Sequence, residues 1–171
     1  MKEALELIDQ IIEEHKHITQ EGRNIKQVSS DYEVGLKLGD AKEGFMPGGV
    51  AGQKRYLQNL QESLETISQE LLAHFEREEK WLLAAFEKHG GQMLAAALRS
   101  LLLEHQELKK RIAKSLEDLA RLAAEGLSRE VWEGQAWGVR TYISHTLKLL
   151  EAHAQSEHEL LLKLRSALIK A

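Results

Sequence analysis

Helix-breaking residues are concentrated at one place in this chain, and this feature constrains its fold most strongly. The only proline, Pro47, lies among four glycines between residues 44 and 52. Elsewhere, apolar side chains recur three or four residues apart over long stretches, which is the spacing of one face of an α-helix. The sequence therefore predicts long helices and one irregular connection, at about residues 30–52.

The periodicity predicts four helices. The first covers about residues 3–29, the second ends at Gly90–Gly91, the third covers about 92–124, and Ser128 is a candidate N-cap for the fourth. Helices joined mostly by short turns pack as antiparallel neighbours that bury their apolar stripes against each other. We therefore predict an all-α fold, an up-down-up-down antiparallel four-helix bundle, formed by a single domain over residues 1–171.

Polar residues interrupt each of the four apolar stripes. A Glu-His pair occurs twice, and each pair is followed further along the chain by His-x-x-x-Glu. The residues on the stripes are His15, His74, Glu78, His105, His153 and Glu157. Four residues along a helix advance about 400°, so the His and Glu of each His-x-x-x-Glu share one face. A buried carboxylate without a partner costs several kcal/mol, and a bound metal would remove this cost.

The ligand types and their number predict a dinuclear metal site. The chain has no cysteine, so its metal ligands must be His, Asp or Glu, which suit iron, manganese or zinc. Two metals could each take two His and share Glu78 and Glu157 as bridging carboxylates. An oxo or hydroxo bridge would add another ligand to each metal. One position on each metal would then stay open for a small molecule.

Residues next to these stripes are harder to interpret. Glu14 and Glu104 could hydrogen-bond a neighbouring imidazole or lie on a solvated helix edge. The other charged residues from 76 to 80 are expected to face solvent. Tyr142 and Trp81 are expected in the core. Further polar candidates are His145, which could line an entrance to the site, and His17, His89 and His158, which are expected at the surface.

The order His, His-x-x-x-Glu, His, His-x-x-x-Glu resembles that of the hemerythrin-like, or HHE cation-binding, domain. This resemblance covers nearly the whole chain. It implies a non-haem di-iron centre with His15 and His74 on one iron, His105 and His153 on the other, and both Glu bridging. Ferritin-like bundles, the main alternative, use Glu-x-x-His on two helices, and this chain has only Glu14…His17.

The sequence departs from oxygen-carrying hemerythrins at two points. Their third helix has a second His where this chain has Lys109, and their last helix has an Asp five residues after its His, whereas Glu157 follows His153 by four. The chain is more similar to the hemerythrin-like domains of iron-centre repair proteins and of the eukaryotic iron-sensing ubiquitin-ligase subunit. Without the extra His, neither iron would be saturated by protein ligands, which favours sensing or reactivity.

We expect a non-haem di-iron protein that binds or senses oxygen, nitric oxide or iron itself. A di-iron redox enzyme that reduces peroxide or nitric oxide, or repairs iron centres, is the alternative, and a metal-free interaction bundle is a third. The 23 basic and 27 acidic residues offer no basic patch for nucleic acid. The chain begins without a signal-peptide pattern and has no apolar run long enough for a membrane span, so we expect a cytoplasmic protein.

Overall fold

The computed structural model describes residues 1–39, 51–124 and 128–170, and every element in these ranges is a helix. The elements are α1 (Lys2–Gly39), α2 (Ala51–Arg77), the π-helical turn η1 (Glu78–Leu82), α3 (Leu83–His89), α4 (Gly91–Leu102), α5 (Glu104–Ala123) and α6 (Arg129–Lys170). The predicted all-α fold is therefore confirmed. No helix in the described ranges is both long and apolar enough to cross a membrane.

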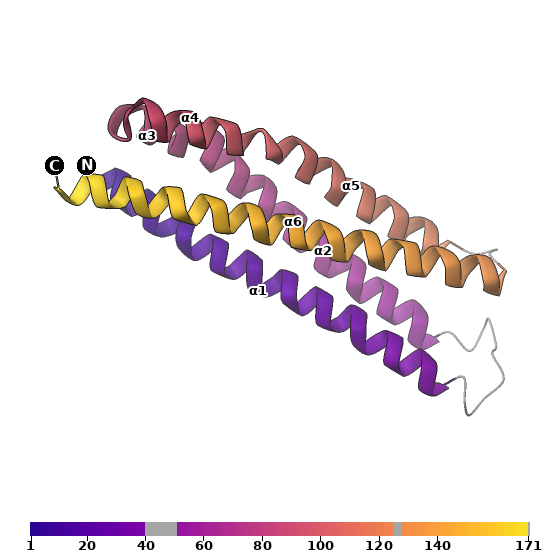
Figure 1. Ribbon diagram of the computed structural model, residues 1–171. Coiled ribbons are helices and arrows are strands. Elements are labelled where there is room, and N and C mark those ends of the chain that lie inside the picture. Colours follow the sequence, from indigo (N-terminus) through magenta and orange to yellow (C-terminus); the bar gives the residue numbers. More distant parts are fainter. Residues whose placement is uncertain (40–50, 125–127, 171) are drawn as a thin grey trace.

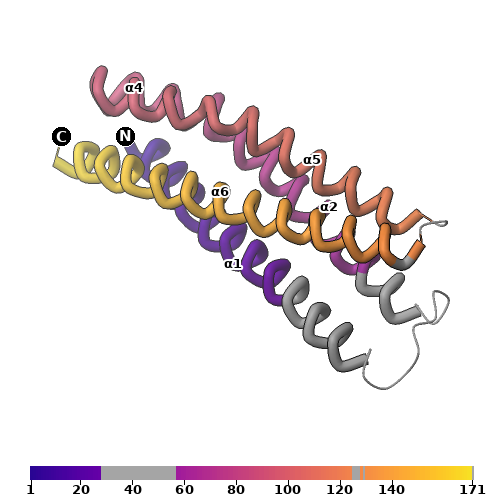
Figure 2. The backbone as a smooth tube through the Cα atoms, turned by 45° about the vertical axis from the view of Figure 1, so that its right-hand side comes forward, coloured from indigo at the N-terminus to yellow at the C-terminus, as the bar shows by residue number. Residues whose placement is uncertain are grey.

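The long helices lie side by side as a bundle (Figures 1 and 2). Helix α1 packs against α2 and α6, and α5 also packs against α2 and α6. The π-helical turn η1 and α3 continue from α2, while α4 leads into α5. Helices α3 and α4 pack against each other at the end of the bundle where both termini lie (Figure 1).

The predicted boundaries at Gly90–Gly91 and Ser128 agree with the structure. Gly91 has a φ of 69°, a left-handed conformation that a glycine adopts readily after a helix. A Cβ on Gly90 would lie 2.8 Å from the carbonyl oxygen of Phe86, so the turn has no room for a side chain. At the start of α6, the Ser128 hydroxyl accepts a hydrogen bond from the Val131 amide at 3.4 Å.

The predicted connection at residues 30–52 is too long at both ends. Helix α1 continues to Gly39 and α2 begins at Ala51, while Pro47 lies outside the described residues. In the sequence, Val34 and Leu38 extend the four-residue apolar spacing beyond residue 29. A single glycine inside a helix costs only about 1 kcal/mol, so Gly35 alone does not end it.

Two apolar clusters form the core. One contains Ile18, Leu71, Leu108 and Leu150, and the other contains Ile11, Leu82, Leu98 and Leu161. Burial of one such side chain contributes about 1.5–3 kcal/mol. Along every long helical segment, the residues that bear the predicted ligands lie between these two clusters. The polar residues therefore form a layer across a bundle that is apolar on either side.

Candidate metal centre

The six residues predicted from the sequence lie in one buried layer. Their side chains come from α1, α2, η1, α5 and α6, so every long helical segment contributes. His15 is 7% exposed, and the others are 2% exposed or less. The six residues of this layer are His15, His74, Glu78, His105, His153 and Glu157. The structure therefore brings together side chains that are far apart in the sequence and normally avoid the interior.

Glu78 lies between imidazoles from three helices. Its Oε1 is 2.7 Å from His74 Nε2 and 3.3 Å from His15 Nε2. Its other oxygen, Oε2, is 3.2 Å from His105 Nε2. One oxygen of this carboxylate therefore faces His15 and His74, and the other faces His105. A bridging carboxylate requires this arrangement.

Glu157 contacts imidazoles from both halves in a similar way. Its Oε2 is 3.4 Å from His15 Nε2 and 3.6 Å from His153 Nε2. The donor atoms form two overlapping groups in which all atoms lie within 4.8 Å of one another. One group is His15, His74, Glu78 and Glu157, and the other is Glu78, His105, His153 and Glu157. Each group has two imidazoles, and both groups share the same two carboxylates.

The buried polar atoms of this layer are not satisfied by hydrogen bonds within the protein. Both oxygens of Glu78, both oxygens of Glu157 and both ring nitrogens of His15 are buried without a hydrogen-bond partner. Their contacts are short, but they lack the alignment of hydrogen bonds. Such groups cost free energy in an apolar core unless a cation binds them. Both the donor set and its unsatisfied atoms therefore fit a metal site.

The electrostatics of the layer couple its two carboxylates to its imidazoles. Burial raises the pKa of Glu157 to about 7, although His15 opposes this shift. Burial alone would lower the pKa of His15, but Glu157 and Glu78 raise it to about 9. Burial also disfavours ionised Glu78, yet His105, His15 and His74 hold its pKa well below its usual range. Glu78 therefore ionises at lower pH than Glu157.

A carboxylate fixes the outer nitrogen of three of the four imidazoles. His74 Nδ1 lies 2.8 Å from Glu14, and His153 Nδ1 lies 3.0 Å from Glu104. His105 Nδ1 lies 2.9 Å from Glu79. Because an ionised carboxylate only accepts hydrogen bonds, each of these Nδ1 atoms carries a proton, and Nε2 is the ring nitrogen that faces the layer. Metal-binding histidines need this tautomer and orientation.

Two of these carboxylates are themselves held in place. Glu14 accepts hydrogen bonds from Arg77 at 3.2 Å and from Gln10 at 2.8 Å. Glu79 accepts one from Lys109 at 2.8 Å. Glu79 is exposed, as predicted, and Arg77 is half-buried, but both also take part in hydrogen bonds around the layer, which the prediction did not include.

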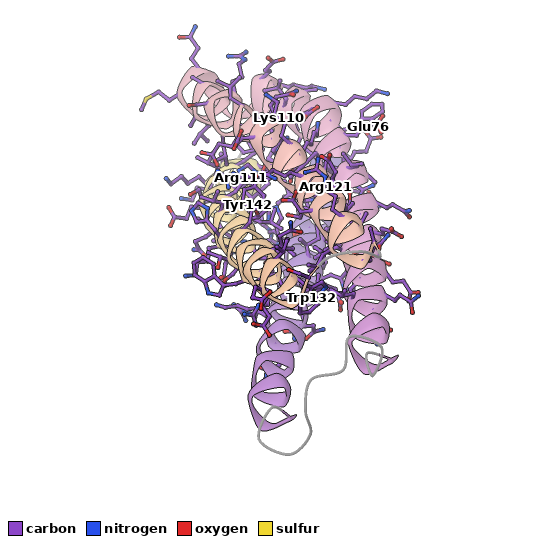
Figure 3. The ribbon with its side chains drawn as sticks, turned by 90° about the vertical axis from the view of Figure 1, so that its right-hand side faces the viewer. Glu76, Lys110, Arg111, Arg121, Trp132 and Tyr142 are labelled. Carbon is purple, nitrogen blue, oxygen red and sulfur yellow. The ribbon has the colours of Figure 1, made fainter. Side chains whose placement is uncertain are left out.

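The other candidates lie outside the layer. His145 is exposed, with its Nδ1 3.3 Å from Arg111 Nη1, and Tyr142 packs with its ring 5.3 Å from the Arg111 guanidinium (Figure 3). His145 therefore lies in a surface cluster and not among the residues of the layer. Trp81 is 57% exposed and not part of the core, because the neighbouring Leu82 points inward. His17 is exposed, as predicted.

Comparison with known families agrees with this geometry. The family of the Hemerythrin HHE cation binding domain matches residues 6–164, which include all six residues of the layer. The comparison with curated proteins gives no match, and neither does the comparison with solved structures. The family match covers most of the chain and both halves of its polar layer. The chain therefore belongs to the hemerythrin HHE cation-binding domain family.

Proposed function

We propose that the buried layer holds a pair of iron ions and that the protein uses them to bind or sense a small ligand. His15 and His74 would hold one iron, and His105 and His153 the other. Glu78 and Glu157 would bridge them. The observation that carries this proposal is that two overlapping groups share two buried carboxylates whose oxygens have no hydrogen-bond partner. Nitrogen and carboxylate ligands together suit iron.

The path of the chain supports the bundle that this site requires. Helix α1 runs away from the end that carries the termini, and the segment from α2 to α3 returns to it (Figure 1). Helices α4 and α5 run away again, and α6 returns. We infer the up-down-up-down order from this path. Each long helical segment then presents its imidazole at the same level of the bundle.

The residues around the layer favour binding over turnover. An iron pair supplies Lewis acidity and reversible electron transfer. Tyr142 and His145, the acid–base candidates from the sequence, lie in a surface cluster with Arg111. The layer is enclosed by apolar side chains on both sides. The protein would therefore exclude bulk water, orient the imidazoles through Glu14, Glu79 and Glu104, and admit small molecules such as oxygen or nitric oxide.

Metal analysis combined with spectroscopy tests this function. The protein would be produced anaerobically with iron, its metal content measured, and its absorption spectrum recorded before and after oxygen is added. We expect close to a pair of irons per chain and a spectral change that inert gas reverses. A change that persists, with turnover when an electron donor is present, would support the redox enzyme instead.

A matched pair of variants locates the metal. His74→Ala should remove iron, whereas His17→Ala, which alters an exposed histidine, should retain it. Zinc alone, or no transition metal, in the wild-type protein after iron-replete anaerobic production would contradict the di-iron proposal. If His74→Ala stabilised the protein as isolated, the metal-free interaction bundle would be the better explanation, because the substitution would have removed an unsatisfied buried group.

A further inference from the structure

A pocket between α1 and α2 reaches one of the candidate metal ligands. Its volume is about 500 Å³. It is lined by Glu14 and His17 from α1 and by Glu70 and His74 from α2, among others. His74 belongs to the metal layer and is 2% exposed. The pocket therefore extends from the surface of the bundle to the edge of that layer.

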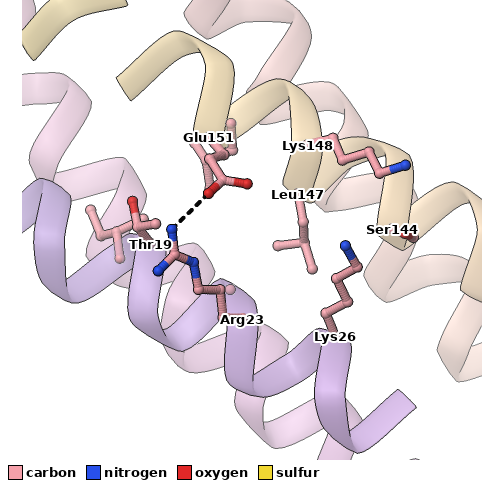
Figure 4. A pocket seen from close by; sticks show the side chains of 10 residues that line it. Thr19, Arg23, Lys26, Ser144, Leu147, Lys148 and Glu151 are labelled. Atoms are coloured by element: carbon pink, nitrogen blue, oxygen red, sulfur yellow. Dashed lines mark hydrogen bonds and ion pairs between the residues drawn. The ribbon is translucent and has the colours of Figure 1, made fainter. Parts of the chain in front are cut away.

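A smaller pocket, between α1 and α6, differs in this respect (Figure 4). Its volume is about 130 Å³, and none of the six residues of the layer lines it. An ion pair at 2.9 Å joins Arg23 on α1 to Glu151 on α6 across it. Of these two pockets, only the one between α1 and α2 leads to the layer.

Two pairs of His and Glu join α1 to α2 along the larger pocket. His17 Nε2 lies 3.4 Å from Glu70 Oε2, and these side chains are 60% and 38% exposed. Glu14 Oε2 lies 2.8 Å from His74 Nδ1, and these side chains are 21% and 2% exposed. The pairs are one helical turn apart, since each helix spaces its two members by three or four residues. Potential metal ligands therefore follow one another from solvent to the layer.

The outer of these pairs contains a carboxylate oxygen that the protein does not satisfy. Glu13 and Glu14 already have cationic partners, Lys16 and Arg77. In contrast, Glu70 Oε2 is buried without a hydrogen-bond partner in the described part of the chain. Two donors that each lie about 2.1 Å from one ion, at right angles, are about 3 Å apart. The carboxylate and imidazole of the outer pair could thus hold a cation with little rearrangement.

The imidazole of His74 separates the pocket from the layer. Its Nδ1 contacts Glu14, which lines the pocket, and its Nε2 lies 2.7 Å from Glu78, which lies in the layer. The inner pair is therefore in contact with both spaces. A cation that reached Glu14 would be one imidazole away from the donors of the layer.

We propose that this pocket is the route by which ferrous iron enters the layer. The inference rests on the proposed function, because it concerns the iron that the layer would hold. Glu70 and His17 bind the ion at the surface, since carboxylate and imidazole both suit iron, and Glu14 receives it beside His74. The route also accounts for the Glu14…His17 spacing, of which the six residues of the layer include neither member.

Rates of iron uptake and release test this route. Metal-free protein is mixed with ferrous iron without oxygen, and a coloured chelator measures the free iron at set times. The same chelator measures release from the iron-loaded protein. We expect Glu70→Gln to slow uptake about tenfold, which is within the contribution of a charged cleft to association rates. Release should slow by the same factor, so the affinity stays unchanged, because a residue on the route lowers the barrier without holding the bound iron.

A second variant and a matched control accompany this measurement. His17→Ala should also slow uptake and release, and it should still retain its iron once loaded. Glu62→Gln makes the same charge change at an exposed position two turns earlier on α2, outside the pocket. It should leave both rates unchanged. Circular dichroism checks that each variant folds.

Three results would overturn the route and leave the di-iron site in place. They are wild-type rates in Glu70→Gln, equal slowing in Glu62→Gln, and a loss of affinity in Glu70→Gln without slower uptake. The last result would mean that Glu70 holds the bound iron. Wild-type protein that takes up no iron, even after long incubation, would instead contradict the proposed function on which the route rests.

Discussion

The two halves of the metal layer come from an internal repeat, yet they are not equivalent. Glu14-His15 in the first half corresponds to Glu104-His105 in the second, and His74 corresponds to His153. In each half, the Glu of the Glu-His pair reaches across to the other imidazole, at 2.8 Å in the first and 3.0 Å in the second. The repeat therefore reproduces a hydrogen bond between helices as well as the candidate ligands.

The other contacts that hold the imidazoles in place differ between the two halves. His105 is fixed by Glu79 and stacks on Phe75, with ring centroids 3.9 Å apart. His15 has no hydrogen bond to its Nδ1 from any part of the chain that is described. At the positions that correspond to Glu79 and Phe75, the second His-x-x-x-Glu segment has His158 and Ala154. Two substitutions in the repeat thus leave His15 as the least constrained imidazole.

Substitution of a proposed bridging carboxylate should give the largest effect, because Glu78 and Glu157 belong to both groups of donor atoms. Glu78→Gln keeps the shape of the side chain but removes the charge that two cations would share. We expect metal to be lost from both positions, whereas His15→Ala should lose metal mainly from one. Metal content after gel filtration measures this difference. If Glu78→Gln keeps half of its metal, Glu78 does not bridge and the halves are independent.

The second prediction concerns the support of His105. Glu79→Gln removes the carboxylate that orients this imidazole, and loss of such a partner typically weakens metal binding 10–100-fold. His158→Gln, the same position in the other half, should change metal affinity little, because His15 gains no bond from His158. Competition with a chelator measures both. Equal losses in the two variants would show that the halves are supported alike.

These differences show which residues of the site could be predicted from the sequence and which could not. The six residues of the layer could be predicted because each occupies a position that the helical period assigns to the core. Glu79 could not be predicted this way, since it follows Glu78 directly and therefore lies off the apolar stripe, yet its side chain contacts His105. The first helix continues to Gly39, ten residues beyond the predicted end at about residue 29.

Glu14 and Glu104 also differ between the halves, although less than His15 and His105 do. The sequence repeat does not predict this difference either. Their hydrogen bonds are similar, but Glu14 is anchored by Arg77 and Gln10, while the Glu104 side chain is 56% exposed. The residue that corresponds to Arg77 in the second segment is Ser156. We expect Glu14→Gln to weaken metal binding about tenfold and Glu104→Gln by less. Chelator competition checks this order, and the reverse order would contradict it.

The halves should also respond differently to pH, and this is the smallest effect. Burial lowers the pKa of His153, whereas the carboxylates Glu157 and Glu78 outweigh burial at His15 and raise its pKa to about 9. Protonated His15 therefore stabilises the metal-free fold fully below pH 6.5, and this contribution is lost as pH rises through 9. The contribution of His153 has the opposite sign, since it is lost as pH falls below 6.5.

Denaturant unfolding of the metal-free protein between pH 7 and 9.5 should thus show a decline in the free energy of unfolding, on the order of 2 kcal/mol. Glu157 adds to this decline only up to its pKa of about 7. His15→Ala should flatten the decline, and His153→Ala should leave it in place. Iron should reverse the trend, because metal binding requires neutral imidazoles and strengthens as pH rises. If the free energy of unfolding declines equally in His15→Ala, groups other than His15 cause the decline. The two halves would then not differ in their response to pH.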